Sequence, residues 1–190
     1  MKLIKEIIKE SAKNLNNGSV ILYPTDTVWG LGSLVTSKAG VEKIYLIKNR
    51  PKSNGLVLMV NSVEMLKHYT NEIPTKAFKL IKHYYKPITI VYKKVKNVPD
   101  WILNGGDTVA IRVVKNQFCE GLISSVKQAI VSTSANVHGS KTPQTYFDIE
   151  DEIKNSVDYI VPASVEEKNE FNASKIISFT DDNELEVIRE

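Results

Sequence analysis

The stretch that decides the fold runs from Tyr23 to Val60 and reads YPTDTVWGLGSLVTSKAGVEKIYLIKNRPKSNGLVLMV. A polar turn rich in hydroxyl groups follows an apolar run, a helical pattern comes next, and a second apolar run at 55–60 closes the unit. Prolines and glycines mark its loops, because proline fixes φ and glycine widens the allowed conformations. The helical pattern ends at Lys48-Asn49-Arg50-Pro51, where the proline stops the helix beside two cations. This arrangement predicts a unit that holds a polyanion between a hydroxyl-bearing loop and a cationic helix end.

Helical and strand patterns continue on both sides of this stretch. Ser37 is the predicted N-cap of the helix that ends near Lys48, and apolar residues recur at helical spacing over 2–15. Strands and helices alternate early, whereas the end of the chain is richer in strand. This order predicts an α/β fold with a twisted, mixed, open sheet flanked by helices. The predicted strands are 19–23, 55–60, 88–92, 108–114, 130–133, 159–161, 175–179 and 184–188; the predicted helices are 2–15, 37–48, 62–69, 75–85, 117–128 and 145–155; the predicted loops are 94–107, 134–143 and 165–172.

Length and composition favour a single domain over residues 1–190. Hydrophobic residues make up 42% and charged residues 25% of the chain, as in an ordinary soluble globular protein. The apolar runs are too short to span a bilayer, and the charged N-terminus does not resemble a signal peptide, so no membrane association is expected. A single cysteine, Cys119, excludes an internal disulfide and fits a cytoplasmic location. With three scattered histidines it forms no zinc-ligand cluster, and no protein metal site is predicted.

The choice of basic residue is more informative than the small net charge of +3, which gives no reason to expect strong nucleic-acid binding. Lysine supplies 22 of the 25 basic residues, and the three arginines are Arg50, Arg112 and Arg189. A guanidinium grips phosphate or carboxylate with two parallel hydrogen bonds, which an ammonium cannot do. We therefore interpret each arginine as a candidate anion-binding residue, with chance as the alternative.

Two candidate sites follow predicted secondary structure in the first half of the chain. Thr25-Asp26-Thr27 comes directly after a strand, where ligands bind in α/β sheets, although hydroxyls also serve as turns and N-caps. Lys48 and Arg50, with Asn54 four residues later, combine a point charge with a planar fork. The alternative for this pair is a solvated helix end that complements the helix dipole.

Two further candidates lie in the second half. In the predicted strand that contains Thr108 and Arg112, residues two apart share one face, so Ala110 lies between them on that face. An arginine in an apolar strand must leave at an edge or pair with an anion. The segment 130–139, IVSTSANVHG, places three hydroxyls, an amide and a glycine after an apolar run. It predicts either an anion-binding nest or a simple turn.

Several common catalytic motifs are absent from the sequence. It contains no P-loop, no H-E-x-x-H, no G-x-S-x-G and no G-x-G-x-x-G. Asp26 has no second carboxylate near it in sequence, so hydrolysis by paired carboxylates is not supported. Cys119 lies in an apolar helical pattern and is interpreted as a core residue rather than a nucleophile. The aromatic residues are scattered and form no stripe for stacking nucleic-acid bases.

In order and spacing, four segments resemble the YrdC/Sua5 family of threonylcarbamoyl-AMP synthases: YPTDTVWGLG (23–32), KNRP (48–51) with Asn54, TVAIR (108–112) and STSAN-x-x-G (132–139). Each motif is modest alone, but the four in order are specific. The resemblance covers residue 3 to the C-terminus and implies a YrdC-like fold with a concave, positively lined cavity. It also implies an activity: L-threonine, bicarbonate or CO2, and ATP give L-threonylcarbamoyladenylate and pyrophosphate. The product would pass to a downstream tRNA threonylcarbamoyl transferase complex, and Mg2+ would accompany ATP as substrate.

The resemblance also implies roles for individual residues, by motif position. Lys48 and Arg50 would be catalytic and would stabilise charge at the α-phosphorus. The threonine-binding residues would be Thr27, Arg112, Ser132 and Ser174. The ATP-binding residues would be Lys48, Arg50, Asn54, Thr108, Ser134, Asn136, Thr142 and Arg189.

The sequence departs from the family pattern at several positions. A histidine common at the amino-acid site corresponds to Met59, and the usual W-P-G-P-L-T corresponds to 84–89, YYKPIT. One alternative function is a YrdC-like module that binds double-stranded RNA or tRNA without forming an adenylate. A second is a relative that has lost the activity, which the intact pair of Lys48 and Arg50 opposes.

Overall fold

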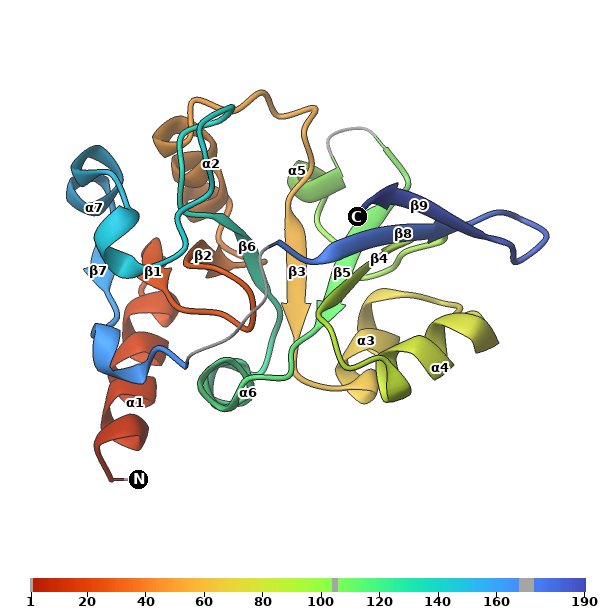
Figure 1. Ribbon diagram of the computed structural model, residues 1–190, viewed down its shortest axis with the longest axis horizontal. Helices are drawn as coiled ribbons and strands as arrows, with labels where there is room; N and C mark the ends of the chain where they lie inside the picture. Colours follow the sequence, from red (N-terminus) through yellow and green to blue (C-terminus); the bar gives the residue numbers. More distant parts are fainter. Residues whose placement is uncertain (1, 104–105, 168–172) are drawn as a thin grey trace.

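The computed structural model describes residues 2–103, 106–167 and 173–190, which form one continuous nine-stranded sheet with helices on both sides (Figure 1). The strand order is β7-β1-β2-β6-β3-β5-β4-β8-β9. The strands are β1 Ile21–Tyr23, β2 Gly30–Leu34, β3 Val57–Val60, β4 Ile88–Tyr92, β5 Val109–Val113, β6 Ile130–Ser134, β7 Tyr159–Ile160, β8 Lys175–Phe179 and β9 Leu185–Arg189.

Parallel and antiparallel pairs alternate irregularly across this sheet. The pairs β1–β7, β3–β5 and β4–β8 are parallel, whereas the other five neighbouring pairs are antiparallel. The prediction of a mixed, open α/β sheet is therefore confirmed; the assignment of 1–190 to one domain stays a prediction. The helices are α1 Lys2–Asn16, α2 Lys38–Ile47, α3 Val63–Tyr69, α4 Thr75–His83, α5 Asp100–Leu103, α6 Gln117–Val126 and α7 Asp151–Ser156, with short 3-10 turns at Tyr146–Asp148 and Ala163–Val165.

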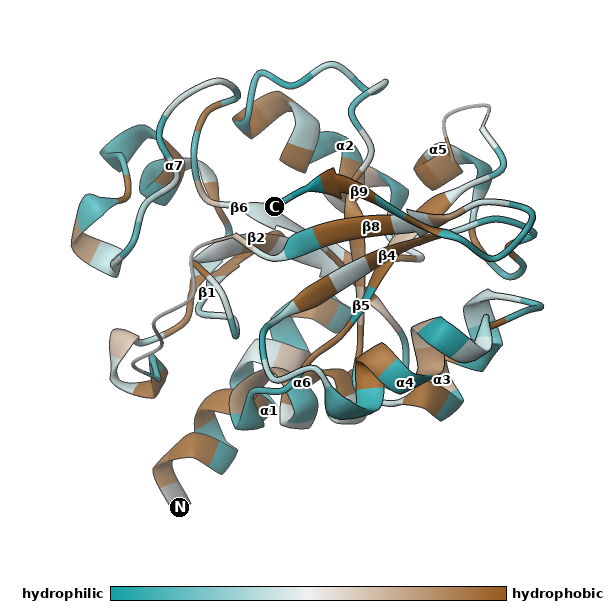
Figure 2. Ribbon diagram, turned by 45° about the vertical axis from the view of Figure 1, so that its right-hand side comes forward, coloured by the Kyte–Doolittle hydropathy of each residue, from teal (hydrophilic) through white to brown (hydrophobic). Residues whose placement is uncertain are grey.

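Two hydrophobic clusters hold the helices against the sheet. Because side chains alternate along a strand, Leu58 and Met59 belong to different clusters. One cluster packs α1 and α6 against the strands, and the other packs α2, α3, α4 and α7. Figure 2 shows hydrophobic stretches on β4, β5 and β8, which are neighbours in the sheet. The buried strands position the polar residues, some of which lie on the strands themselves and others in the loops beside them.

Strand β2 was not predicted, because its sequence GLGSL contains two glycines and a serine. All five residues are buried, and β2 pairs with both β1 and β6. A Cβ on Gly32 would lie 2.6 Å from the Tyr23 ring, and one on Gly30 would lie 3.1 Å from the Ser132 hydroxyl oxygen. The glycines are thus required by the close approach of neighbouring side chains, which a propensity argument does not reveal.

The remaining differences from the predicted elements are small. A short helix, α5, forms within the predicted loop 94–107, of which residues 104–105 lie outside the described residues. The predicted helix 145–155 is a 3-10 turn followed by α7. Ser37 caps α2 as predicted, accepting a hydrogen bond from the Gly40 backbone nitrogen at 3.2 Å. Of the predicted loop 165–172, residues 168–172 lie outside the described residues.

Candidate active site

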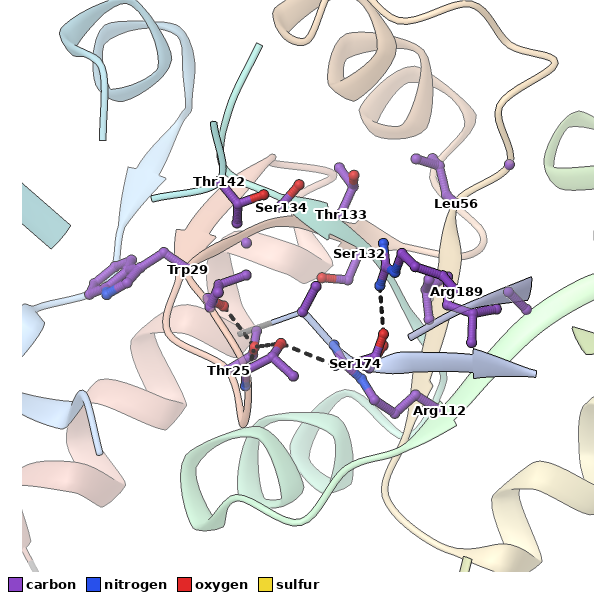
Figure 3. Close-up of a pocket in the computed structure, with 18 of the residues that line it drawn as sticks. Thr25, Trp29, Leu56, Arg112, Ser132, Thr133, Ser134, Thr142, Ser174 and Arg189 are labelled. Carbon is purple, nitrogen blue, oxygen red and sulfur yellow. Dashed lines mark hydrogen bonds between the residues drawn. The ribbon is translucent and has the colours of Figure 1, made fainter. Parts of the chain in front are cut away.

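An open cavity lies where several strands come together, and all three arginines of the chain line it (Figure 3). Arg50 follows α2, Arg112 lies on β5, and Arg189 lies on the edge strand β9. In Figure 3, Ser134 and Thr142 lie together along one rim of the cavity. Within the part of the chain that the structure describes, the lining contains hydroxyl side chains and arginines but no carboxylate: Thr25, Thr27, Val28, Trp29, Gly30, Arg50, Gly55, Leu56, Val57, Ala110, Arg112, Ser132, Thr133, Ser134, Thr142, Ala173, Ser174, Ile176 and Arg189.

The guanidinium group of Arg189 is close enough to those of Arg50 and Arg112 to be repelled by both. Burial, followed by repulsion from Arg112 and Arg50, lowers the pKa of Arg189. Burial also lowers the pKa of Arg50. Because arginine stays protonated in proteins, these shifts express the cost of burying a cation, to which repulsion by the other two arginines adds at Arg189, rather than a change of charge. A polyanion in the cavity would relieve that cost.

Arg112 is only 7% exposed and has an incomplete set of partners. Its Nη1 donates to the Thr27 hydroxyl oxygen at 3.1 Å and lies 3.7 Å from an oxygen of Asp26. Its Nε and Nη2 both contact the Met59 sulfur at 3.2 Å. A thioether is a weak acceptor, so Met59 leaves most of the hydrogen-bonding capacity of the fork unused. The expectation that an arginine in this strand pairs with an anion is confirmed by Asp26, but that pairing is too long for a hydrogen bond.

The hydroxyls of Thr25 and Thr27 form an ordered chain beside Arg112. Thr25 Oγ1 donates to the Val28 carbonyl oxygen at 2.7 Å and lies 2.9 Å from Thr27 Oγ1. Since Thr25 has one hydroxyl hydrogen, Thr27 must be the donor within the threonine pair. Thr27 therefore presents an accepting oxygen to Arg112 and to the cavity.

Two cavity serines are each bonded to a hydroxyl buried behind them. The Tyr23 hydroxyl donates to Ser132 Oγ at 2.9 Å, and Thr89 Oγ1 lies 2.7 Å from Ser174 Oγ. The Ser174 carbonyl oxygen also accepts a hydrogen bond from Arg189 Nη2 at 2.8 Å, shown as a dashed line in Figure 3. Tyr23 and Thr89 were not among the predicted site residues, because a buried hydroxyl in a strand gives no signal in sequence.

Lys48 does not line the cavity but lies beneath its rim, and it is 1% exposed. Its Nζ donates to the carbonyl oxygens of Ser134 at 2.5 Å and Asn136 at 2.6 Å. Burial, followed by repulsion from Arg50, lowers the pKa of Lys48 to about 7. In this arrangement Lys48 fastens the turn after β6 to the end of α2, and the His138 backbone nitrogen adds a bond to the Lys48 carbonyl oxygen at 2.8 Å.

The predicted site residues thus divide into two groups. Eight of them line one cavity: Thr27, Arg50, Arg112, Ser132, Ser134, Thr142, Ser174 and Arg189. The other four lie outside its lining: Lys48, Asn54, Thr108 and Asn136. Their individual roles toward a ligand stay predictions.

The four residues outside the lining have other contacts or positions. The Asn54 side-chain amide lies 3.2 Å from His138 Nε2, and the Asn136 amide donates within its own turn to the Ser140 carbonyl oxygen at 2.7 Å. Thr108 is exposed and precedes β5, so the expected common face reaches only from Ala110 to Arg112.

Fold and cavity together define a mixed-sheet α/β protein with a cationic, hydroxyl-lined cavity suited to an anionic ligand. The family model Sua5_yciO_yrdC, described as telomere recombination, matches residues 13–190. This chain therefore belongs to the Sua5/YciO/YrdC family.

Three of the relatives found by sequence share one name. Threonylcarbamoyl-AMP synthase of Idiomarina loihiensis is 30% identical over 158 residues, which are 82% of this chain and 85% of that protein. The protein of the same name from Pseudoalteromonas translucida is 33% identical over 150 residues, with 77% and 80% of the two chains covered. The Pyrococcus abyssi protein of that name is 31% identical over 155 residues, which are 81% of this chain but 46% of the longer relative.

Solved structures agree with these sequence relationships. P. abyssi Sua5 complexed with L-threonine superposes on this chain with a TM-score of 0.83 and 29% sequence identity. The match includes 92% of this chain and 51% of the Sua5 chain. E. coli YciO has a TM-score of 0.84 and 28% identity, with 98% of this chain and 89% of that chain covered. The predicted YrdC-like fold and family membership are both confirmed.

Proposed function

We propose that this chain forms L-threonylcarbamoyladenylate and pyrophosphate from L-threonine, bicarbonate or CO2, and ATP. The observation that carries the proposal is the cavity itself, which gathers Arg50, Arg112 and Arg189 with a set of hydroxyls. Two relatives that align with this chain over at least 80% of their own length are named threonylcarbamoyl-AMP synthase. A related protein of known structure binds L-threonine.

The reaction needs no nucleophile from the protein, which fits the side chains present. The threonine amine attacks CO2 and loses a proton to give a carbamate. A carbamate oxygen then attacks the α-phosphorus of ATP, and the bond to the pyrophosphate leaving group breaks. Charge accumulates on phosphate oxygens during this step, so fixed guanidinium groups stabilise it and hold the reactants together. The buried Cys119 takes no part, since burial raises the pKa of its thiol.

The hydrogen-bonding groups of the cavity suggest which end would bind the amino acid and which end would bind ATP. Arg112, Ser132 and Ser174, with the accepting oxygen of Thr27, form the end that would take the amino acid. Arg50, Arg189 and the rim residues Ser134 and Thr142 would take ATP. Lys48 acts in this proposal by holding the rim turn, because its ammonium is already bonded to two carbonyl oxygens.

Mg2+ enters this proposal as part of the substrate MgATP. Among residues 2–103, 106–167 and 173–190, no cluster of three or more His, Cys, Asp or Glu side chains could hold a metal ion. Mg2+ commonly relies on substrate phosphates and keeps much of its water, so the donors here suit a metal carried by ATP rather than by the protein. The metal would neutralise phosphate charge, and the arginines would orient the complex.

A cytoplasmic location and transfer of the product to a tRNA threonylcarbamoyl transferase complex are part of the same proposal. None of the helices in the described segments combines the length and apolar character needed to cross a bilayer. The single cysteine is buried and free, as suits a reducing compartment. Direct binding of tRNA belongs to the alternative function.

Pyrophosphate release tests the proposal when each of threonine, bicarbonate and ATP is omitted in turn. The expected result is that release requires all three and that threonylcarbamoyladenylate forms in equal amount. Release that is independent of threonine would contradict the proposed function. The alternative, an RNA-binding module, instead predicts salt-dependent RNA binding and no pyrophosphate.

A further inference from the structure

We infer that Tyr23 and Thr89, both buried behind the cavity wall, are positioning residues that fix Ser132 and Ser174 as hydrogen-bond donors to the carboxylate of the bound amino acid. This inference rests on the proposed function and deepens it. Tyr23 ends β1, whereas Thr89 lies on β4, so the two residues support the amino-acid end of the cavity from separate parts of the sheet. Neither residue lines the cavity.

Ser132 accepts a hydrogen bond from Tyr23, which lies behind the cavity wall. Tyr23 is 1% exposed, and its hydroxyl donates to Ser132 Oγ at 2.9 Å. Burial raises the pKa of the Tyr23 phenol, so it keeps this hydrogen. One lone pair of Ser132 is thereby occupied, while its own hydrogen has no other acceptor among the described residues. Because Ser132 lines the cavity, that hydrogen is available to a ligand.

Ser174 is placed like Ser132, with the hydroxyl of Thr89 behind it. Thr89 is fully buried, and Ser174 Oγ, at 2.7 Å, is the one acceptor within the described residues that its hydroxyl reaches. A buried hydroxyl that kept its hydrogen unbonded would lose free energy, so Thr89 donates to Ser174. The Ser174 hydrogen is then also available to the cavity.

The amino-acid end of the cavity separates hydrogen-bond donors from a hydrogen-bond acceptor. Arg112 offers N–H groups, and Ser132 and Ser174 offer hydroxyl hydrogens, so three donors converge on one region. Thr27 has already given its hydrogen to Thr25 and offers a lone pair. A carboxylate accepts hydrogen bonds and an amine donates them. This pattern of donors and acceptors therefore directs the carboxylate of the bound threonine toward Arg112 and the two serines. The amine of the bound threonine is directed toward Thr27.

Threonine binding without ATP, measured by calorimetry, tests the role of Tyr23. Tyr23→Phe keeps the ring and removes the donor, so Ser132 loses its fixed orientation. The expected result is a Kd for threonine raised about 3- to 10-fold, in keeping with the loss of one hydrogen bond. In steady-state assays the KM for threonine should rise while the KM for ATP stays unchanged, which a general structural defect would not produce.

The chain offers a matched control in Tyr92. This tyrosine is 3% exposed, lies on β4, and its buried hydroxyl has no hydrogen-bond partner among the described residues. Tyr92→Phe should leave threonine binding unchanged. A double-mutant cycle completes the design: adding Tyr23→Phe to Ser132→Ala should cause no further loss, because Tyr23 acts through Ser132.

A second pair of variants keeps the test informative if Tyr23→Phe does not fold. Thr89→Val with Ser174→Ala should show the same non-additive loss of threonine binding. Normal threonine binding by a folded Tyr23→Phe or Thr89→Val, or full additivity in either cycle, would overturn the inference alone. A wild-type protein that binds no threonine would overturn the proposed function and this inference with it.

Discussion

Arg50 links the loop after α2 to the cavity, because its guanidinium contacts two backbone carbonyl oxygens of that loop. Nε donates to the Asn54 carbonyl oxygen at 2.9 Å, and Nη2 donates to that of Gly55 at 2.8 Å. The remaining N–H groups are left for a ligand. Lysine would keep the charge but could not brace the loop and contact a phosphate at the same time. We expect Arg50→Lys to lower kcat at least about 100-fold, as for the loss of one preorganised donor to developing charge.

Pyrophosphate release and thermal unfolding together check this expectation. The unfolding temperature of Arg50→Lys should stay close to that of the wild type, because Arg50 is only half buried. Turnover close to that of the wild type would show that charge alone is sufficient at this position. A matched decrease in stability and activity would instead indicate that the loop, and not the phosphate contact, was lost.

The buried ammonium of Lys48 makes folding stability depend on pH. Its pKa is lowered to about 7 in the folded protein, whereas an unfolded lysine titrates near 10.4. Between these values the unfolded chain binds a proton that the folded chain has released, so stability rises with pH there. The rise from this residue is at most about 1.4 kcal/mol per pH unit, and it stops below the folded pKa.

Urea unfolding of the wild type and Lys48→Met at pH 6, 8 and 9.5 measures this contribution. The wild type should gain stability relative to the variant as the pH increases, because methionine carries no proton. Parallel pH profiles would mean that the carbonyl oxygens of Ser134 and Asn136 hold the Lys48 pKa at its ordinary value. Because the wild type and the variant are compared at the same pH, the contributions of the other titrating groups to stability cancel.

Individual site residues differ in how far sequence could predict them. The three arginines were found from their scarcity, since a chain of 22 lysines and three arginines makes each arginine informative. The position of Lys48 beneath the rim depends on where the turn after β6 passes, and that is set by pairing of β6 with β2 and β3. Asp26 was recognised as a loop residue, but its role as the charge nearest Arg112 required the packing of two distant segments.

At the scale of elements, α2 packs closely against β2 at Gly40. A Cβ on Gly40 would lie 2.0 Å from the Ser33 hydroxyl oxygen and 2.9 Å from the Ser33 Cβ. Ser33 is fully buried, so it has little room to move. We expect Gly40→Ala to destabilise the protein by about 1–3 kcal/mol from overpacking, in spite of the better helix propensity of alanine.

Gly121 on α6 is the matched control, because it is also a helical glycine. A Cβ there would lie 2.7 Å from Cδ1 of Ile8, the far end of a flexible side chain that can turn away. Gly121→Ala should therefore stay within about 1 kcal/mol of the wild type in chemical denaturation. Equal losses for the two variants would contradict the argument from the Gly40 contact.

The elements differ in how well the sequence predicts them. Helices with an apolar stripe and strands of apolar residues were placed within a few residues, because periodicity reports burial directly. Strand β2 failed this test since its burial depends on small residues that admit the Tyr23 ring and the Ser33 contact with α2. Without β2, neither the strand order nor the position of the hydroxyl loop beside β6 could be derived.

At the scale of the whole molecule, the cavity is a convergence of segments far apart in the chain. Its walls come from residues 25–30, 50–57, 110–112, 132–142, 173–176 and 189. Arg189, one residue from the C-terminus, bonds to the Ser174 carbonyl oxygen and faces the same space as Arg50. A ligand that bridges these walls should stabilise the distant segments together. Any local unfolding that disrupts the site must also release the ligand, so its free energy of unfolding increases by the free energy of binding.

Amide hydrogen exchange measures this coupling segment by segment. Threonine alone should slow exchange in the 25–30 loop and at 174–176, where the hydroxyls and Arg112 converge. Addition of MgATP should extend protection to the 50–56 loop, to the turn after β6 and to β9, although β9 lies at the opposite end of the chain and at the edge of the sheet. Helix α4, which contributes no residue to the cavity lining, serves as the internal control and should change only if the whole protein is stabilised. Protection confined to one wall would show that the segments form separate sites, whereas joint protection of β9 and the 50–56 loop by MgATP requires a single ligand held between Arg50 and Arg189.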